Sequence, residues 1–283
     1  MKNRAANISV HAWESDGILL ERYAYTAGSV EPLPKHSHED YQFGLSVDCQ
    51  GEYYYRGAYH AIPPGSLSVI HSGEVHSPSD RTYLPEPAHF EMMHVSPKWL
   101  HIVSAEMAEK PVSLPFFATV CLIDSELNRL FLALQAATNQ HVSTLEREIT
   151  LWGFLSYLIR NHALNHPCVP PLKSAYAAIM VARDYLHADY ARDVSLEALA
   201  AIAGLSRFHF CRAFRKQLGV SPSAYQTQLR IAQAKKLLVQ GLSIATVSTM
   251  TGFYDQSHFG WHFKRQVGVT PGAYISSISA KQQ

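Results

Sequence analysis

Cysteine is scarce in this sequence, and the cysteines that occur are not paired. The chain of 283 residues contains only Cys49, Cys121, Cys168 and Cys211, and no two of them form a Cys-x-x-Cys motif. A disulfide-stabilised secreted domain or a thiolate zinc site needs cysteines at characteristic close spacings. The sequence therefore predicts reduced thiols and favours the cytoplasm over an oxidising compartment.

Long hydrophobic runs are also missing. No apolar stretch approaches the roughly 18 residues that a membrane-spanning helix needs, so we expect no membrane span. The first seven residues are not followed by the apolar core of a signal peptide. With 47% hydrophobic residues, the chain is nevertheless long and apolar enough to form two domains, each with its own core.

Acidic residues become rare in the C-terminal part of the chain. Residues 170–283 contain 13 Lys and Arg against 5 Asp and Glu, whereas residues 1–169 contain 11 against 18. The overall net charge of +1 hides this asymmetry. A basic part joined to an acidic part indicates that only the former meets a polyanion, although an incidental basic face is an alternative that charge alone leaves open.

The first 115 or so residues are rich in short β-forming runs, such as residues 42–47, 51–56 and 66–70, which glycine and proline separate. Strands at this spacing are typical of a sandwich or a small barrel. From about residue 124 to 164 the hydrophobic period is helical, with Asp124 or Ser125 placed to cap the first of two amphipathic helices. We expect these helices either to cover the open end of the β-domain or to pair with a second subunit.

One sequence pattern occurs twice near the C-terminus. Residues 208–225, FHFCRAFRKQLGVSPSAY, return 49 positions later as residues 257–274, SHFGWHFKRQVGVTPGAY, with nine of eighteen positions identical. In each copy a capped short helix and a glycine precede the repeated text, so each copy predicts two helices joined by a tight turn. Such a turn makes the second helix project, and a projecting helix fits the major groove of B-DNA.

These residues carry a family resemblance. The span of about residues 175–275, and most clearly residues 252–259 (GFYDQSHF) and 263–274, resembles the DNA-binding domain of the AraC/XylS family of bacterial transcription regulators. The resemblance implies two helix-turn-helix units, joined by a long helix at about residues 222–239, that read successive major grooves of double-stranded DNA. It also implies a homodimer that works with RNA polymerase.

The family's DNA contacts can be transferred position by position. In the first unit the expected base-contacting residues are Arg207, Phe208, Cys211 and Arg212; in the second they are Gln256, Ser257 and Trp261, with Gly260 offering no side chain. Phe208 and Trp261 are equally consistent with packing inside the domain. The residues expected to contact phosphates are Arg215, Lys216, Lys264 and Arg265.

The N-terminal part carries a second resemblance. Residues 33–43 and 64–76 resemble the two motifs of the cupin barrel, the N-terminal domain type of many AraC-like regulators. This implies a pocket for a small-molecule effector, for which the candidates are His36, His38, Tyr41, Gln42, Tyr53, Tyr55 and His76. In metal-binding cupins the positions of His36, His38, Gln42 and His76 hold a divalent transition metal, but Gln42 stands where a carboxylate is usual. The histidines are alternatively organic-ligand or structural residues.

The chain is thus expected to be an α+β multidomain protein, with a cupin-like β-barrel, flanking α-helices and an all-α C-terminal domain. The expected function is that of a non-enzymatic transcription regulator controlled by an effector; the alternatives are a metal-sensing regulator and a metal-dependent cupin enzyme fused to a DNA-binding domain. The expected divisions are residues 1–120 for the barrel, 121–165 for the helical dimerisation or packing segment, 166–174 for a proline-rich linker and 175–283 for the DNA-binding domain, with helix-turn-helix units at 195–218 and 244–267.

Overall fold

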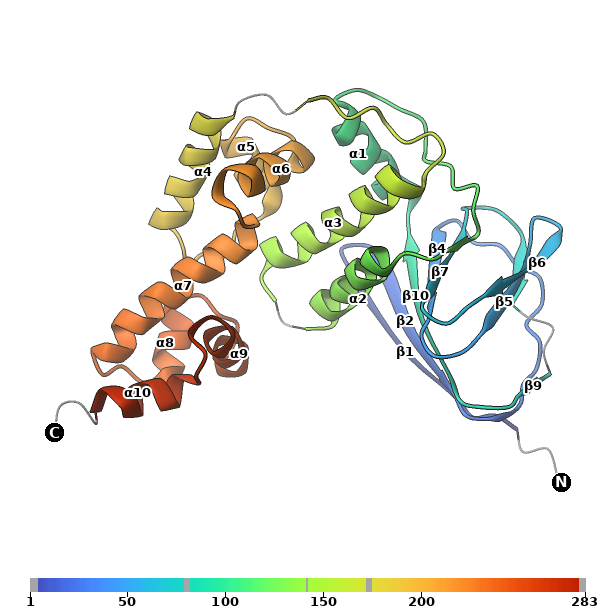
Figure 1. Ribbon diagram of the computed structural model, residues 1–283, viewed down its shortest axis with the longest axis horizontal. Helices are drawn as coiled ribbons and strands as arrows, with labels where there is room; N and C mark the ends of the chain where they lie inside the picture. The colour runs from blue at the N-terminus through green and yellow to red at the C-terminus, as the bar shows by residue number, and fades with distance from the viewer. Residues whose placement is uncertain (1–4, 79–81, 141, 172–174, 280–283) are drawn as a thin grey trace. The chain divides into compact units, whose positions relative to one another are not determined.

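The computed structural model describes residues 5–78, 82–140, 142–171 and 175–279 (Figure 1). Residues 172–174 of the expected linker lie outside the described residues, as do both chain ends. The chain divides into two compact units: Met1–Asn139 with Gly153–Val169, and Gln140–Trp152 with Pro170–Gln283. None of the helices in the described part of the chain has the length and apolarity that crossing a bilayer requires.

The first unit is built on antiparallel sheets, which confirms the β-rich expectation. The largest has six strands in the order β1-β2-β10-β4-β7-β11, and a second has three in the order β6-β5-β8. A further pair, β3-β9, is isolated from both. The strand bounds are β1 Ile8–Ser15, β2 Ile18–Tyr25, β3 Gly28–Ser29, β4 Tyr41–Ser46, β5 Gly51–Tyr55, β6 Ala58–Ile62, β7 Ser66–Ile70, β8 His76–Pro78, β9 Tyr83–Leu84, β10 Ala88–Val95 and β11 Cys121–Leu122.

Two helices cover one face of the large sheet. They are α2 (Ser125–Asn139) and the second half of α3 (Thr144–His162). The ring of Phe154 on α3 lies 6.0 Å from that of Phe43 on β4 and 5.7 Å from that of Phe131 on α2. All three rings are fully buried. Packing within one chain is therefore observed, while the pairing of these helices with a second subunit stays a prediction.

The segment expected to be β-rich also contains a helix, α1 (Pro97–Ala108), which the sequence reading missed. The Ser96 side chain accepts a hydrogen bond from the Lys98 N–H, and Pro97 occupies the first helical position, where its missing N–H costs nothing. Burial of Leu100, Val103 and Met107 then holds the helix against the unit. At the start of α2, Asp124 rather than Ser125 is the cap, because its Oδ1 accepts from the N–H groups of the next turn.

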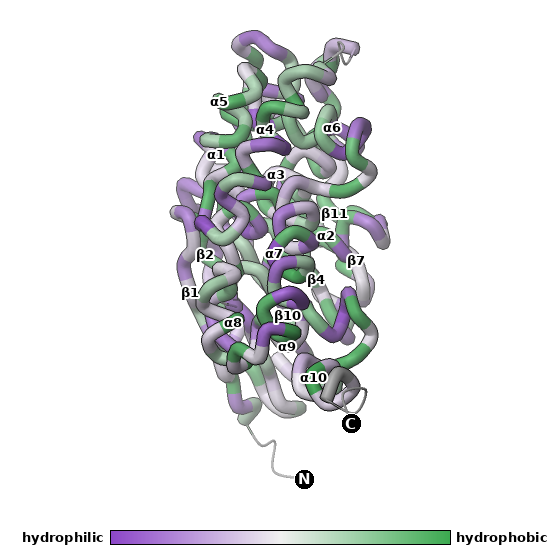
Figure 2. Tube along the Cα trace, turned by 90° about the vertical axis from the view of Figure 1, so that its left-hand side faces the viewer, coloured by the Kyte–Doolittle hydropathy of each residue, from purple (hydrophilic) through white to green (hydrophobic). Residues whose placement is uncertain are grey.

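The second unit is helical, and the two helix-turn-helix units and the long helix lie where the repeat predicts them. Along these helices hydrophobic and hydrophilic residues are interleaved (Figure 2). The phenylalanines shared by the two copies are buried in the two cores. The helix bounds are α4 Tyr176–Ala188, α5 Leu196–Ile202, α6 Arg207–Leu218, α7 Pro222–Val239, α8 Ile244–Met250, α9 Gln256–Val267 and α10 Pro271–Ser279.

Helix α7 holds the two helix-turn-helix units in one structure. The Arg230 side chain, 3% exposed, donates hydrogen bonds to the carbonyl oxygens of Tyr190 (2.8 Å) and Arg192 (3.1 Å). Gly252, in the turn between α8 and α9, has φ +79°, and a Cβ there would lie 2.0 Å from the carbonyl oxygen of Ala191. The segment before the first unit therefore contacts both α7 and the turn of the second unit.

Candidate effector cavity and DNA-binding surface

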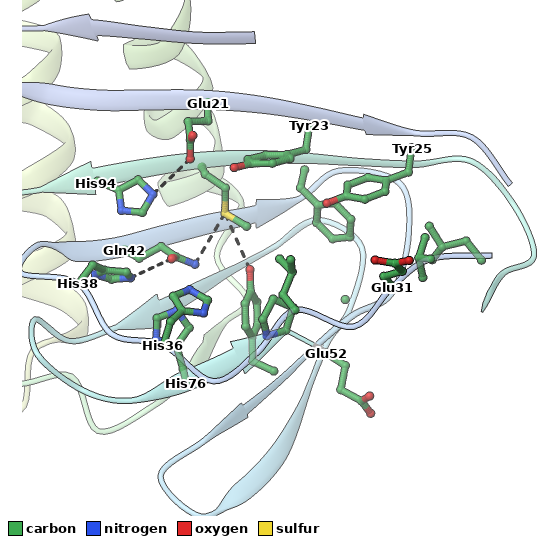
Figure 3. Close-up of a pocket in the computed structure, with 18 of the residues that line it drawn as sticks. Glu21, Tyr23, Tyr25, Glu31, His36, His38, Gln42, Glu52, His76 and His94 are labelled. Carbon is green, nitrogen blue, oxygen red and sulfur yellow. Dashed lines mark hydrogen bonds and ion pairs between the residues drawn. The ribbon is translucent and has the colours of Figure 1, made fainter. Parts of the chain in front are cut away.

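The first unit contains a partly open cavity of about 450 Å³. Its walls come from β2 and β10 of the large sheet, from β5 and β8 of the small sheet, and from the segments around Glu31 and His36 (Figure 3). An antiparallel backbone bridge between His36 and His76 joins the two cupin-like motifs beside it. Of the residues predicted to form a pocket, five line this cavity: His36, His38, Gln42, Tyr53 and His76.

Tyr41 and Tyr55, also predicted for the pocket, are not among the residues that line the cavity. Neighbouring residues of a strand point to opposite faces, so Gln42 faces the cavity and Tyr41 faces the helices. There the Tyr41 hydroxyl donates to the Pro115 carbonyl oxygen at 3.3 Å. Tyr55 is fully buried, and its hydroxyl is engaged by the Glu74 carboxylate and by the His71 N–H.

The three predicted histidines direct the same ring nitrogen, Nδ1, toward the backbone. In each, Nδ1 faces a backbone carbonyl oxygen, to which only a ring N–H can donate, so in the neutral ring Nε2 carries the lone pair. The ring of His76 lies 4.4 Å from that of His36 and 4.9 Å from that of His38. The carbonyl oxygens are those of Pro34 for His36 (3.0 Å), Asp40 for His38 (2.6 Å) and Glu74 for His76 (3.2 Å).

His76 offers the cavity a buried hydrogen-bonding atom. Its side chain is 1% exposed, and its Nε2 has no hydrogen-bond partner. Burial, with a contribution from the neighbouring imidazoles, lowers its pKa to about 4, so the ring is neutral at pH 7. Because Nδ1 donates to Glu74, the unpartnered Nε2 is an acceptor that a ligand N–H or O–H can satisfy.

The sequence reading missed the wall formed by β2 and β10. Its lining residues occupy alternate positions: Leu19, Glu21, Tyr23 and Tyr25 on β2, and Phe90, Met92 and His94 on β10. The strands are antiparallel neighbours in which Glu21 pairs with Met92 and Tyr23 with Phe90. The alternation along β2 was the available signal, but the pairing that brings residue 94 beside residue 21 joins strands that are distant in sequence.

Among the described residues of the cavity, no three His, Cys, Asp or Glu side chains bring their donor atoms within 4.8 Å of one another. Within the described residues, the group of three ligands whose donor atoms lie within 4.8 Å of one another is Glu146, His258 and His262, in the second unit. There the two histidine Nε2 atoms are 2.8 Å apart and hydrogen-bond each other. In the cavity, His38 Nε2 lies 3.0 Å from the side-chain amide of Gln42. Because His38 Nδ1 donates to the Asp40 carbonyl oxygen, the neutral ring accepts at Nε2, and the Gln42 amide occupies that nitrogen with its N–H group turned toward it.

The predicted base-contacting residues of the first unit lie on α6. Arg207, Cys211 and Arg212 are half-buried, whereas Phe208 is only 8% exposed. The Arg212 guanidinium lies 5.4 Å from the centre of the Phe208 ring. This burial favours the packing role for Phe208, and base contact by any of the four stays a prediction.

The predicted residues of the second unit lie on α9 and are more accessible. Gln256 and Ser257 are exposed, and Trp261 is 55% exposed with the Arg265 guanidinium 5.0 Å from its ring centre. This exposure favours a surface role for Trp261 over packing. All the predicted phosphate-contacting residues are exposed: Arg215, Lys216, Lys264 and Arg265.

Comparison with known proteins agrees with this architecture. Residues 22–155 match the AraC-like ligand binding domain, and residues 199–277 match a helix-turn-helix domain. The uncharacterized HTH-type transcriptional regulator YbfI of Bacillus subtilis (strain 168) is 29% identical over 246 residues, covering 84% of this chain and 85% of that protein. The DNA-binding domain of AdpA, solved in complex with a target DNA, is 30% identical over 37% of this chain and 95% of that chain, with a TM-score of 0.36.

A ligand-binding β-domain followed by paired helix-turn-helix units defines a DNA-binding transcription regulator with an N-terminal ligand-binding domain. The chain belongs to the AraC family of these regulators. The family resemblance of both parts, drawn from the sequence motifs, is thereby confirmed.

Proposed function

We propose that an organic small molecule, bound in the cavity of the first unit, controls how the two helix-turn-helix units bind DNA. The observation that carries this proposal is the buried, unpartnered Nε2 of His76 in a cavity of about 450 Å³. An unsatisfied buried polar atom costs free energy, which a ligand donor recovers. The volume lies in the range of small-molecule sites. A ligand acts on DNA binding only if it binds one arrangement of the chain better than another.

We further infer a homodimer that acts in the cytoplasm together with RNA polymerase and without enzymatic activity. Exposed apolar side chains at and near α2 support a subunit interface, since Ile123 is 80% exposed and Leu132 46% exposed. None of the four cysteines, all of which are described, forms a disulfide, in keeping with a reducing compartment. The relatives are named as transcriptional regulators, which supports regulation rather than catalysis.

A metal-sensing regulator or metal-dependent cupin enzyme is the second candidate. Its support is the shared orientation of His36 and His76, because hydrogen bonding of Nδ1 to a carbonyl is how proteins orient metal-binding imidazoles. Two observations favour the organic ligand instead. His38 already contacts Gln42, and no three His, Cys, Asp or Glu donor atoms among the described residues of the cavity lie within 4.8 Å of one another. Metal analysis of the purified protein separates the two, because a catalytic cupin retains near-stoichiometric metal.

A ligand screen on the full-length protein tests the proposed function. Compounds that raise the melting temperature by binding are then titrated against a duplex that the protein binds. We expect cavity ligands to change the DNA affinity, and His76→Phe, which removes the Nε2 acceptor and adds bulk at the cavity wall, to abolish both effects while leaving DNA binding without ligand intact. A compound that saturates the cavity and leaves DNA affinity unchanged contradicts the proposal.

A further inference from the structure

A carboxylate at the wall of the cavity has hydrogen-bond donors but, among the described residues, no lysine or arginine partner. Glu21 on β2 is 18% exposed, and its Oε2 lies 3.3 Å from His94 Nε2. Its second partner is the hydroxyl of Tyr23, whose pKa burial and the Glu21 charge raise to about 12. Burial, and then the nearby His38, lowers the pKa of His94, so both partners are neutral at pH 7. The carboxylate is therefore partly desolvated without a counter-charge, a state that a bound cation stabilises.

The remaining charges of the cavity have the same sign. Among the described residues that line it, Glu21, Glu31 and Glu52 are the carboxylates, and neither lysine nor arginine is present. His36 and His76 add acceptors, because their Nδ1 atoms donate to the backbone and leave Nε2 with a lone pair. The first 169 residues are also acidic as a whole, with 18 Asp and Glu against 11 Lys and Arg. The field in the cavity therefore favours a positive ligand and disfavours an anion.

An aromatic wall adjoins the Glu21 carboxylate. Glu21, Tyr23 and Tyr25 follow one another on the cavity face of β2 (Figure 3). The Tyr25 ring meets that of Phe90, on β10, edge-on at 6.0 Å, and the Tyr23 and Tyr25 rings lie 6.3 Å apart. Aromatic faces attract ammonium groups through their quadrupoles, and they offer apolar area to the rest of a ligand.

We propose that the ligand of this cavity is an organic cation, a protonated amine on an apolar or aromatic body. This inference rests on the proposed function, in which the cavity binds a small molecule. The ammonium group lies against Glu21 and the faces of Tyr23 and Tyr25, and a further ligand donor reaches Nε2 of His76. A metal ion shares the positive charge, but it draws on the imidazoles rather than on the carboxylate and the aromatic wall.

Isothermal titration of the full-length protein with matched ligands tests this assignment. Each set has an amine, an alcohol and a carboxylate on the same body: benzyl, 2-phenylethyl or 2-(indol-3-yl)ethyl. We expect the best amine to bind about tenfold or more tightly than its alcohol, because one ionic contact in a desolvated site exceeds a neutral hydrogen bond. The carboxylate of the same set is expected to bind most weakly.

Substitutions test which side chains of the cavity bind the ammonium group of the ligand. Glu21→Gln keeps the shape and is expected to weaken the amine about tenfold while leaving the alcohol unchanged. Tyr25→Leu keeps apolar area but removes a ring that the ammonium group contacts, and it is expected to weaken the amine roughly two- to thirtyfold. Glu14→Gln is the matched control, since Glu14 is an exposed carboxylate on the neighbouring β1 outside the cavity. It removes the same charge and is expected to change neither affinity.

Several outcomes overturn the inference: an alcohol or carboxylate that binds as tightly as its amine, no binding by any amine, or amine binding that Glu21→Gln leaves unchanged. Tight binding of Zn²⁺ alone that His36→Ala abolishes and Glu21→Gln does not would assign the positive charge to a metal. DNA titration keeps the proposed function separate. A neutral or anionic ligand that alters DNA affinity contradicts only the ligand class, whereas Glu21-dependent amine binding with no effect on DNA contradicts only the effector role.

Discussion

At the scale of single residues, the two copies of the repeat differ at the positions predicted to contact bases. Helix α6 of the first unit carries Arg207, Cys211 and Arg212, and helix α9 of the second carries Gln256, Gly260 and Trp261 at the corresponding positions. The buried phenylalanines that form the two cores are shared. The shared phenylalanines therefore give the two units the same core, while the differing positions are expected to let them read different sequences.

Two substitutions distinguish a residue that contacts a base from one that contacts a phosphate. Arg212→Ala should relax the preference at one base pair, at a cost of about 1–3 kcal/mol for the preferred base, because an arginine can bind guanine through two hydrogen bonds. Lys264→Ala should weaken binding to all duplexes and reduce the salt slope by about one. Anisotropy titrations against duplexes varied one base pair at a time, at several salt concentrations, measure both. Equal, sequence-independent losses from the two variants would remove the base-reading role of Arg212.

Two glycines of the second helix-turn-helix unit give a matched pair. Gly252→Ala is expected to destabilise the protein by about 1–3 kcal/mol or more, since φ is +79° and the Cβ would lie 2.0 Å from the Ala191 carbonyl oxygen. Gly260→Ala on α9 meets nothing within 4 Å and should stabilise by about 0.5–1 kcal/mol through helix propensity. Urea unfolding of both variants measures the difference, and a tolerated Gly252→Ala would disprove the close approach at the turn.

At the scale of elements, local signals predicted the helices of the second unit well. The long helix expected at about residues 222–239 is α7, Pro222–Val239, because a capping serine and a proline mark its start. The helix α1 was missed, since its own cap, Ser96-Pro97, lies in a stretch whose composition favours strands. Burial of the apolar side chains of α1 against the rest of the unit stabilises the helix rather than a strand. This contact cannot be predicted from the local sequence.

One wall of the cavity could be predicted from contiguous sequence motifs, whereas the opposite wall could not. The cupin-like motifs predicted His36, His38, Gln42 and His76 because each motif is short and contiguous. The opposite wall depends on the pairing of β2 with β10, which joins Glu21 to Met92 across the chain. No residue pattern within either strand specifies its partner. The carboxylate and the aromatic residues that define the ligand class therefore became visible only in the folded chain.

At the scale of the whole molecule, buried neutral histidines make stability depend on pH. His76 in the first unit and His262 in the second each have a pKa lowered from 6.5 to about 4, in both cases chiefly by burial. Between these values the unfolded chain binds more protons than the folded chain. Stability is therefore greatest above about pH 6.5 and falls as the pH is lowered toward 4.

Urea unfolding at pH 7 and pH 5 tests this dependence. We expect each such histidine to remove roughly 1–2 kcal/mol of unfolding free energy on acidification to pH 5. His76→Gln cannot take up a proton at this position. Its free energy of unfolding should therefore fall less steeply as the pH is lowered than that of the natural chain. An unchanged pH dependence in that variant would show that His76 does not contribute.

The two helix-turn-helix units of this chain are expected to read DNA with unequal specificity. Selection from a library of random duplexes by the full-length protein, followed by sequencing, tests it most directly. Two units on one face of DNA predict an enriched motif with two blocks about one helical turn, or 10 base pairs, apart, one block more strongly specified than the other. Recovery of duplexes with no enrichment over the starting library, or with a single block, would show that the chain does not carry two DNA-reading units.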